Sequence, residues 1–304
     1  MRKALKVGVV CGILLLGTEI GLRFILGNFA QSALVELVDD PELCLVLGKN
    51  RHLEYTGWWG KVDGTLMGSN TFGSREDRNS KNHKKQLFMI GDSFTYGQGV
   101  NQKDSLPALV QAEIPDVDIW NFGVPGRDFF QFAAEIQRLK SLKPDLILMN
   151  IFANDFDLAP KTCMFSEGSS WQLPVMRQCY LCRLGLFAFT MNQSKTEVPR
   201  QEMERAILSE LQKIQKTVKE DGIELIIVFL TDESTMIGEK KELPDIRALI
   251  KSRAAKNVDL RYTWEELTMN PKEYTIPNEF HLNAEGNQIL AKEYAKQLKS
   301  LLRD

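Results

Sequence analysis

Histidine is scarce in this sequence, and so is any excess of positive charge. The 304 residues contain only three histidines, His52, His83 and His281, so a mechanism that needs an imidazole has few candidates. Lysine and arginine total 38 against 40 acidic residues, and a net charge of −2 does not supply the basic field that holds nucleic acid. Hydrophobic residues make up 43% and charged residues 26%, as in an ordinary folded chain. We therefore expect one large domain with accessory segments, and no nucleic acid as the main partner.

Cysteine is also sparse, and its spacing does not complete a metal site. Cys179 and Cys182 form one C-x-x-C, but neither a second C-x-x-C nor an H-x-x-x-H is present to supply the other zinc ligands. The sequence also lacks a P-loop and a dinucleotide-binding fingerprint, so we expect no metal and no organic cofactor. In an exported chain, a disulfide from Cys163 to Cys179 or Cys182 is the favoured interpretation, and unpaired thiols are the alternative.

The N-terminus carries the one long apolar stretch. Arg2 and Lys3 precede apolar runs over residues 7–16 and 20–26, which together reach about 20 residues, enough to cross a bilayer. No A-x-A-like cleavage site follows. The pattern predicts an uncleaved signal anchor, a transmembrane helix over residues 1–27, with its basic end in the cytoplasm and the rest of the chain exported. A cleaved signal peptide and a buried core helix are the alternatives.

Short apolar runs alternate with helical patterns from residue 85 onward. Because the strands are mostly apolar and alternate with helices, the pattern predicts an α/β domain with a parallel sheet covered on both faces. We assign residues 85–304 to this domain, with an irregular insertion at about 156–199 that could form a lid or a substrate wall. Residues 28–84 are expected to form an N-terminal extension of short strands and loops packed on it. The expected strands lie at 87–90, 117–120, 146–149, 225–229 and 258–262, and the expected helices at 104–113, 128–139, 200–220 and 283–302.

Polar residues follow the first three expected strands. Ser93 follows the first, Asn121 with Gly123 the second and Asn154 the third, and ligands of parallel sheets bind beyond the carboxyl ends of the strands. His281 precedes the last helix and is the only histidine after residue 85. This set predicts a serine nucleophile with a histidine base, and an oxyanion hole formed by the Ser93 and Gly123 amides and the Asn154 side chain. The alternatives are a helix N-cap at Ser93 and a structural histidine.

These motifs resemble those of the SGNH hydrolase superfamily, also called the GDSL esterase and lipase family. The four matching blocks are G-D-S at 91–93, N-F-G-V-P-G at 121–126, N-D at 154–155 and H-L-N at 281–283, and the resemblance spans about residues 86–302. Residues 40–73 also look like the extension of membrane-anchored bacterial members. The resemblance implies a flavodoxin-like three-layer α/β/α fold with a central parallel sheet. It also implies ester hydrolysis through an acyl-enzyme on Ser93, with His281 as the general base.

Two positions depart from the family pattern. Phe152 stands where the third block usually has glycine, and we expect it to narrow the acyl pocket. Most members place aspartate three residues before the histidine, where this chain has Asn278, and two residues before the histidine it has Glu279. Asparagine can hold an imidazole but cannot stabilise the imidazolium. We therefore favour Glu279 as the orienting carboxylate, with Asn278 as the alternative and a Ser/His dyad as the third possibility.

Together these features predict a membrane-anchored, extracytoplasmic serine esterase on the periplasmic or cell-surface side. Its expected substrate is a small ester, or an O-acetyl or acyl group on a cell-surface glycan or lipid. One alternative is an O-acyltransferase, in which a glycan hydroxyl replaces water. Another is a non-catalytic glycan-binding or scaffold protein on a decayed hydrolase fold, which the departures at Asn278 and Phe152 motivate.

Overall fold

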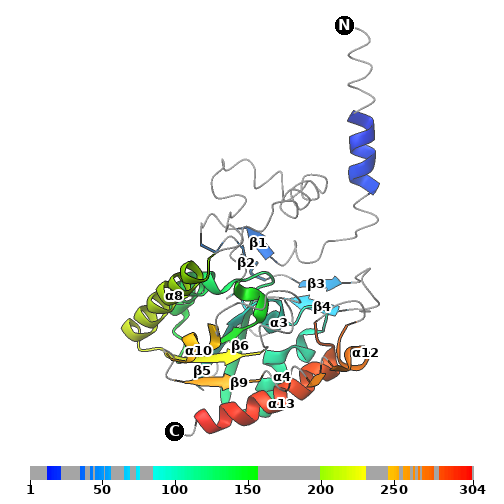
Figure 1. The fold of residues 1–304 in the computed structure, drawn as a ribbon. Helices are drawn as coiled ribbons and strands as arrows, with labels where there is room; N and C mark the ends of the chain where they lie inside the picture. The colour runs from blue at the N-terminus through cyan, green and yellow to red at the C-terminus, as the bar shows by residue number, and fades with distance from the viewer. Residues whose placement is uncertain are drawn as a thin grey trace.

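The structure is a computed structural model, shown as a ribbon in Figure 1. It describes residues 12–21, 35–37, 42–43, 45–50, 52–55, 65–68, 73–75, 85–156, 199–230, 246–252, 256–260, 263, 266–267, 269–276 and 281–302.

Five parallel strands form the central sheet, in the order β6-β5-β7-β8-β9. Numbered by their own sequence, the strands run 2-1-3-4-5, which is the flavodoxin-like order that the family resemblance implied. The register aligns Gly91 at the end of β5 with Gly123 at the end of β6, so both strands finish at the same edge. The strands are β5 (Lys85–Gly91), β6 (Val117–Gly123), β7 (Leu146–Ile151), β8 (Glu224–Phe229) and β9 (Asn257–Asp259).

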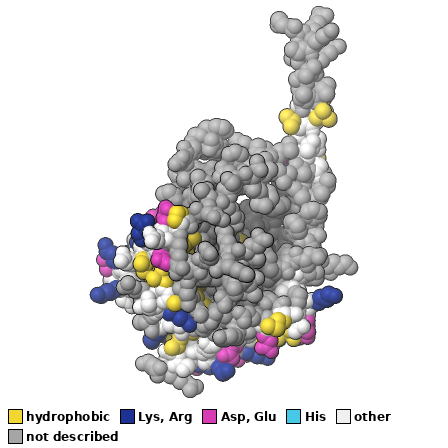
Figure 2. Space-filling view, in the orientation of Figure 1, with side chains coloured by type: hydrophobic (Ala, Val, Ile, Leu, Met, Phe, Trp, Pro, Cys, Tyr) yellow, Lys and Arg dark blue, Asp and Glu magenta, His cyan; other side chains and the backbone are white. Residues whose placement is uncertain are grey.

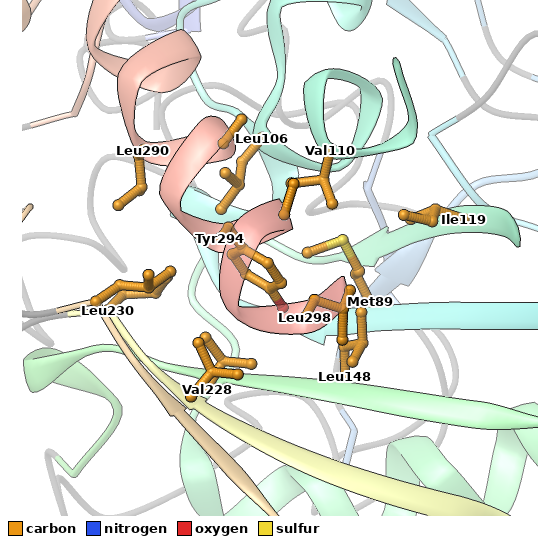
Figure 3. Close-up of a cluster of buried hydrophobic side chains, with 14 of the residues drawn as sticks. Met89, Leu106, Val110, Ile119, Leu148, Val228, Leu230, Leu290, Tyr294 and Leu298 are labelled. Atoms are coloured by element: carbon orange, nitrogen blue, oxygen red, sulfur yellow. The ribbon is translucent and has the colours of Figure 1, made fainter. Parts of the chain in front are cut away.

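Helices cover both faces of this sheet and make the fold a three-layer α/β/α structure (Figure 1). Alternate side chains of each strand point to opposite faces, so Met89 and Phe88 enter different cores. The helices on the Met89 face are α4 (Leu106–Glu113) and α13 (Ala284–Leu301), and those on the Phe88 face are α5 (Phe132–Leu139), α8 (Arg200–Glu220) and α10 (Ile246–Lys251). Figure 3 shows the first core, in which Tyr294 of α13 directs its ring toward the sheet strands that carry Met89 and Leu148.

Capping residues explain where two expected helices differ from the observed ones. The helix expected at 104–113 begins only at Leu106, because Ser105 is extended and Pro107 occupies the first turn. Residues before it form the short 3-10 helix η1 (Gln102–Asp104). The helix expected at 128–139 is divided into η2 (Phe129–Gln131) and α5, and a capping box of Asp128 and Gln131 starts the first part. The expected helix at 200–220 is confirmed as α8.

Two small antiparallel pairs precede the sheet. β1 (Val35–Leu37) pairs with β2 (Leu45–Leu47), and β3 (His52–Tyr55) pairs with β4 (Thr65–Gly68). This part of the chain touches the α/β domain through a hydrogen bond of 2.9 Å from Nη1 of Arg127 to the Leu43 carbonyl. Arg127 also forms a buried ion pair with Glu135, with 3.0 Å between Nη2 and Oε2.

Several sequence predictions concern residues outside the described ranges. Cys163, Cys179 and Cys182 are among them, so the disulfide and the insertion at about 156–199 stay predictions. Only part of the expected anchor is described: residues 12–21 are helical, and Leu14, Leu15 and Leu16 are more than 60% exposed. In the ranges that the structure covers, no helix is both long enough and apolar enough to span a bilayer.

The described surface carries charges of both signs. On the face drawn in Figure 2, lysine and arginine side chains lie among aspartate and glutamate side chains over the described part of the domain. Mixed charge of this kind agrees with the net charge of −2.

Candidate active site

Ser93 begins a very short helix immediately beyond the end of β5. This helix, α3 (Ser93–Tyr96), has Asp92 as its N-cap, and Oδ1 of Asp92 accepts a hydrogen bond of 2.9 Å from the Phe94 amide. Ser93 is therefore the first helical residue and not the cap, and the N-cap interpretation of Ser93 is wrong. An amide at the first helical position has no acceptor within the helix, which leaves the Ser93 N–H available to another group.

The side chains of Ser93 and His281 meet at hydrogen-bond distance. Nε2 of His281 lies 2.9 Å from Oγ of Ser93, although the two residues are 188 positions apart in the chain. The residues are 8% and 6% exposed, so the pair is shielded from most solvent while it still reaches the surface. With its proton on Nδ1, a neutral imidazole accepts the serine proton at Nε2, which is the geometry that an activated nucleophile requires.

A short antiparallel contact holds His281 in this position. Thr275 and Leu282 form an isolated β-bridge, and the Ile276 amide donates to the His281 carbonyl at 2.9 Å. Directly after it, Asn283 caps α13 by accepting a hydrogen bond of 2.9 Å from the Gly286 amide at Oδ1. The backbone at His281 is thus held on one side by the bridge and on the other by the start of a long helix.

Two glycines allow α3 to lie against the strand ends. A Cβ on Gly123 would lie 2.3 Å from the Tyr96 backbone nitrogen, and a Cβ on Gly91 would lie 2.1 Å from Oγ1 of Thr95. Contacts this short do not occur, so any other residue would push the serine helix away from the sheet. The glycines of the first two sequence blocks are therefore required by the close approach of α3.

The predicted oxyanion donors are only partly placed by the structure. Gly123 lies next to α3, but its amide donates to Oδ1 of Asn121 at 3.0 Å, so it must share or exchange this bond to reach an oxyanion. The backbone of Asn154 lies in the 3-10 helix η4 (Ala153–Phe156), directly beyond β7. The Asn154 side chain is outside the described residues, and its role stays a prediction.

The orienting acid is also not placed. Asn278 and Glu279 lie outside the described residues. The choice between these two residues and a Ser/His dyad stays open.

Phe152 is a core residue beneath the serine helix. Its ring is 1% exposed and stacks on Phe94, with 3.5 Å between ring centroids and 19° between planes. Phe94 in turn lies 4.8 Å from the His281 ring. The Phe152 ring thus packs on the Phe94 ring, which itself lies beside His281. The expected narrowing of an acyl pocket stays a prediction.

A buried carboxyl group lies just behind the site. Oδ2 of Asp155 accepts a hydrogen bond of 2.8 Å from the Phe152 amide. Burial raises the pKa of Asp155 well above its ordinary value, the negative charge of Asp92 raises it further, and the Phe152 hydrogen bond opposes them. Asp92 and Asp155 therefore both accept a backbone hydrogen bond in the turns that follow their strands.

Sequence reasoning missed two polar residues that support the site, Asn150 and Arg75. Asn150 lies in the apolar strand β7, accepts 2.9 Å from the Tyr294 hydroxyl and donates 2.9 Å to Oγ1 of Thr95 in α3. A polar residue inside a buried strand was the available signal. Arg75 is fully buried and contacts the end of α3, but it lies in the run Arg-Glu-Asp-Arg, whose composition is typical of a solvated loop.

A metal centre is not formed by the part of the chain that the structure describes. Among those residues, no group of three or more histidine, cysteine, aspartate or glutamate side chains is placed to hold an ion. The reactive groups that the structure describes at this site are the Ser93 hydroxyl, the His281 imidazole and the backbone amides near them.

The chain is similar, at low identity, to a number of solved structures. One is a member of the lipolytic protein G-D-S-L family from Veillonella parvula DSM 2008, with 16% identity, a TM-score of 0.46 and coverage of 70% of this chain and 98% of that one. The lipase/acylhydrolase from Enterococcus faecalis has 14% identity, a TM-score of 0.43 and coverage of 71% and 96%. A catalytic mutant of an acetylxylan esterase from Geobacillus stearothermophilus has 16% identity, a TM-score of 0.42 and coverage of 72% and 96%.

The family itself follows from a match to a family model. No curated protein matches the chain. The model of the GDSL-like lipase/acylhydrolase family matches residues 89–289, which is more than half of the sequence and includes both Ser93 and His281. The chain therefore belongs to the GDSL-like lipase/acylhydrolase family and is an SGNH-type hydrolase of ester bonds.

Proposed function

We propose that this hydrolase is a serine esterase that forms an acyl-enzyme on Ser93, with His281 as the proton carrier. The observation that carries this proposal is the 2.9 Å contact between Oγ of Ser93 and Nε2 of His281. Ser93 lies just beyond the end of β5, and His281 lies three residues before the start of α13. Both residues lie within the segment that the family model matches. The contact also favours catalysis over the non-catalytic scaffold that the sequence left open.

The reaction follows from this geometry in two halves. Nε2 of His281 accepts the Ser93 proton as Oγ attacks the ester carbonyl, and the imidazolium then donates that proton to the departing alcohol. Water then attacks the acyl-enzyme carbonyl while Nε2 of His281 accepts its proton, and the imidazolium returns this proton to Oγ of Ser93 as the acyl–oxygen bond breaks and the acid leaves. The Ser93 amide, the Gly123 amide and the Asn154 side chain are the proposed donors to the oxyanion in both halves.

The imidazolium that forms in each half requires a partner at Nδ1. Glu279 is our first choice, because a carboxylate stabilises the positive ring and an asparagine does not. Asn278 is the second choice, since it occupies the position where most family members have aspartate. Both residues precede His281 by only two or three positions in the sequence.

The substrate and the location are proposed from the N-terminal sequence. We propose a membrane-anchored enzyme whose domain faces the periplasm or the cell surface, with an O-acetyl or acyl group on a glycan or lipid as its substrate. The basic N-terminus before an apolar stretch supports the anchor, and so does the exposure of Leu14, Leu15 and Leu16 on a helix. A tethered esterase meets substrates that are themselves at the membrane.

The test is hydrolysis of short-chain nitrophenyl esters together with labelling by a fluorophosphonate that reacts with activated serines. We expect Ser93→Ala to abolish labelling and to lower kcat by at least about 10³-fold. Glu279→Gln should lower kcat by up to about 10⁴-fold while Asn278→Ala has a smaller effect, and the reverse order would assign the acid to Asn278.

Two results would change this conclusion. Folded wild-type protein that neither labels nor hydrolyses any ester would contradict a Ser93 acyl-enzyme. Product that forms faster when a sugar acceptor is added, with the acyl group recovered on the sugar, would assign the chain as an O-acyltransferase.

A further inference from the structure

Arg75 lies before the α/β domain in sequence, yet its side chain ends at the serine helix. It is fully buried, and its guanidinium donates to three backbone carbonyls at the C-terminal end of α3 and just beyond it. Nη1 donates to the carbonyls of Tyr96 and Gly97, the latter at 2.6 Å, and Nη2 donates to Val100 at 2.7 Å. The guanidinium also lies 4.3 Å from the centre of the Tyr96 ring.

The amides of α3 do not reach these carbonyls. The Asn121 side chain donates to the Tyr96 carbonyl and the Val100 amide donates to the Gly97 carbonyl at 3.4 Å, and Arg75 adds the charged donor. The last carbonyls of any helix lack an amide partner, and α3 has only four residues in which to make such bonds. A positive charge at a helix C-terminus is favourable, and charged donors form stronger hydrogen bonds than neutral ones. Arginine suits the position because its planar fork presents several N–H groups in fixed directions, which a lysine does not.

The backbone of Arg75 binds β6, the strand that ends at Gly123. Its amide donates to the Asn121 carbonyl at 2.8 Å. The Asn121 side chain donates to the Tyr96 carbonyl at 3.2 Å and accepts from the Gly123 amide at 3.0 Å. One residue therefore connects the helix that carries Ser93 with the strand end that carries Gly123.

We propose that Arg75 is a positioning residue of the hydrolase: it clamps α3 against the end of β6, so that Ser93 keeps its distance to His281 and its register with Gly123. This inference rests on the proposed function, in which Ser93 is the nucleophile. It also assigns part of the active-site framework to a residue outside the matched family segment of 89–289. The clamp acts on geometry and not on substrate, so its loss lowers kcat and leaves KM nearly unchanged.

The test uses the full chain with Arg75→Lys, Arg75→Met and Arg75→Ala. A displacement of reacting groups by about 1 Å can lower a rate by about 10²-fold, and we expect a loss of kcat of this order in R75M with KM within about three-fold of wild type. R75K keeps the charge but loses the fork, and we expect an intermediate loss of about ten-fold. Guanidinium at millimolar concentration should restore part of the kcat of Arg75→Ala, because it supplies the missing donors.

Arg127→Met is the matched control. Arg127 is also a buried arginine, and it also joins the N-terminal segment to the domain, but its guanidinium binds the Leu43 carbonyl and Glu135 and not α3. R127M should be destabilised without a specific fall in kcat at temperatures where it is folded. Equal loss of kcat in R127M and R75M, or wild-type kcat in folded R75K and R75M, would overturn the clamp.

A second readout does not depend on turnover. The amides of Tyr96, Gly97 and Gln98 are hydrogen-bonded to Asp92 and Ser93, and their hydrogen exchange should accelerate in R75M but not in R127M. If wild-type protein neither labels nor hydrolyses esters, the proposed function fails, and the catalytic role of Arg75 fails with it. If wild-type protein is active and exchange at these amides is the same in R75M as in wild type, only the clamp is wrong.

Discussion

Asp155 carries a carboxyl group into a part of the site where charge is costly. Its folded pKa lies above its unfolded value because burial and the Asp92 charge disfavour the ionised form. The protein therefore has this contribution to stability in full below about pH 4, the ordinary aspartate pKa, and loses it as pH rises through the folded pKa. A neutral side chain of the same shape would not show this loss.

Asp155→Asn tests this reasoning. The asparagine oxygen still accepts the Phe152 amide hydrogen, but the side chain cannot ionise. We expect the free energy of unfolding of D155N, measured by urea titration, to fall less than that of wild type between about pH 4 and neutral pH. Asp145→Asn is the control, because Asp145 also accepts a backbone amide, that of Gln86 at 2.7 Å, but is exposed. A wild-type pH dependence in D155N would contradict the assignment.

Site residues that directly follow a predicted strand or precede a predicted helix could be predicted from the sequence. Site residues without such a position could not. Ser93, Gly123 and His281 stand directly beyond strands or before a helix, so motif and topology together located them. Arg75 acts through backbone carbonyls, which leave no trace in the sequence. Asn278 and Glu279 both precede His281 closely, and spacing alone does not distinguish them.

Most elements were predicted because their patterns reflect burial on one face or on two. The strands of the central sheet are apolar because both of their faces are covered, and α8 shows its inward residues at helical spacing. The predicted and observed elements differ at their ends, where local capping residues determine at which residue a helix begins. The last expected strand, 258–262, is observed as β9 at Asn257–Asp259, which begins one residue earlier, and residues 261–262 lie outside the described residues.

Two hydrogen bonds between side chains connect α13, β7 and α3. Tyr294 donates to Asn150, which donates to Thr95, and all three side chains are buried. In Tyr294→Phe the Asn150 oxygen loses its donor in the core, so we expect a loss of about 1–3 kcal/mol in the free energy of unfolding, measured with urea. Tyr274→Phe, at a partly exposed position, should change stability by less than about 0.5 kcal/mol. Equal effects in the two variants would contradict a structural role for the Tyr294 hydroxyl.

The whole molecule is larger than its family match, and the added N-terminal residues are part of its packing. The side chains of Leu43 and Leu47 are buried, and the Leu43 carbonyl accepts a hydrogen bond from Arg127. The guanidinium of Arg75 donates to the Gly97 carbonyl at the end of α3. The flavodoxin-like sheet could be predicted from the alternation of strands and helices. The dependence of the site on residues before 85 could not, because short polar segments give no periodic signal of the surface that they bind.

A chain that starts at residue 85 tests this dependence. It keeps all of residues 89–289 but lacks Arg75 and Leu43, so the carbonyls of Tyr96, Gly97 and Val100 lose their charged donors. At about 1.5–3 kcal/mol for each hydrogen bond lost from a charged donor, we expect a loss of at least about 3 kcal/mol in the free energy of unfolding relative to a chain that starts at residue 28. Thermal unfolding by circular dichroism and nitrophenyl ester turnover measure the two consequences. If the shorter chain unfolds at the same temperature and turns over esters at the same rate, the domain is complete without its N-terminal segment. If it is unstable and inactive while the longer chain is neither, the catalytic unit of this hydrolase begins before the segment by which its family is defined.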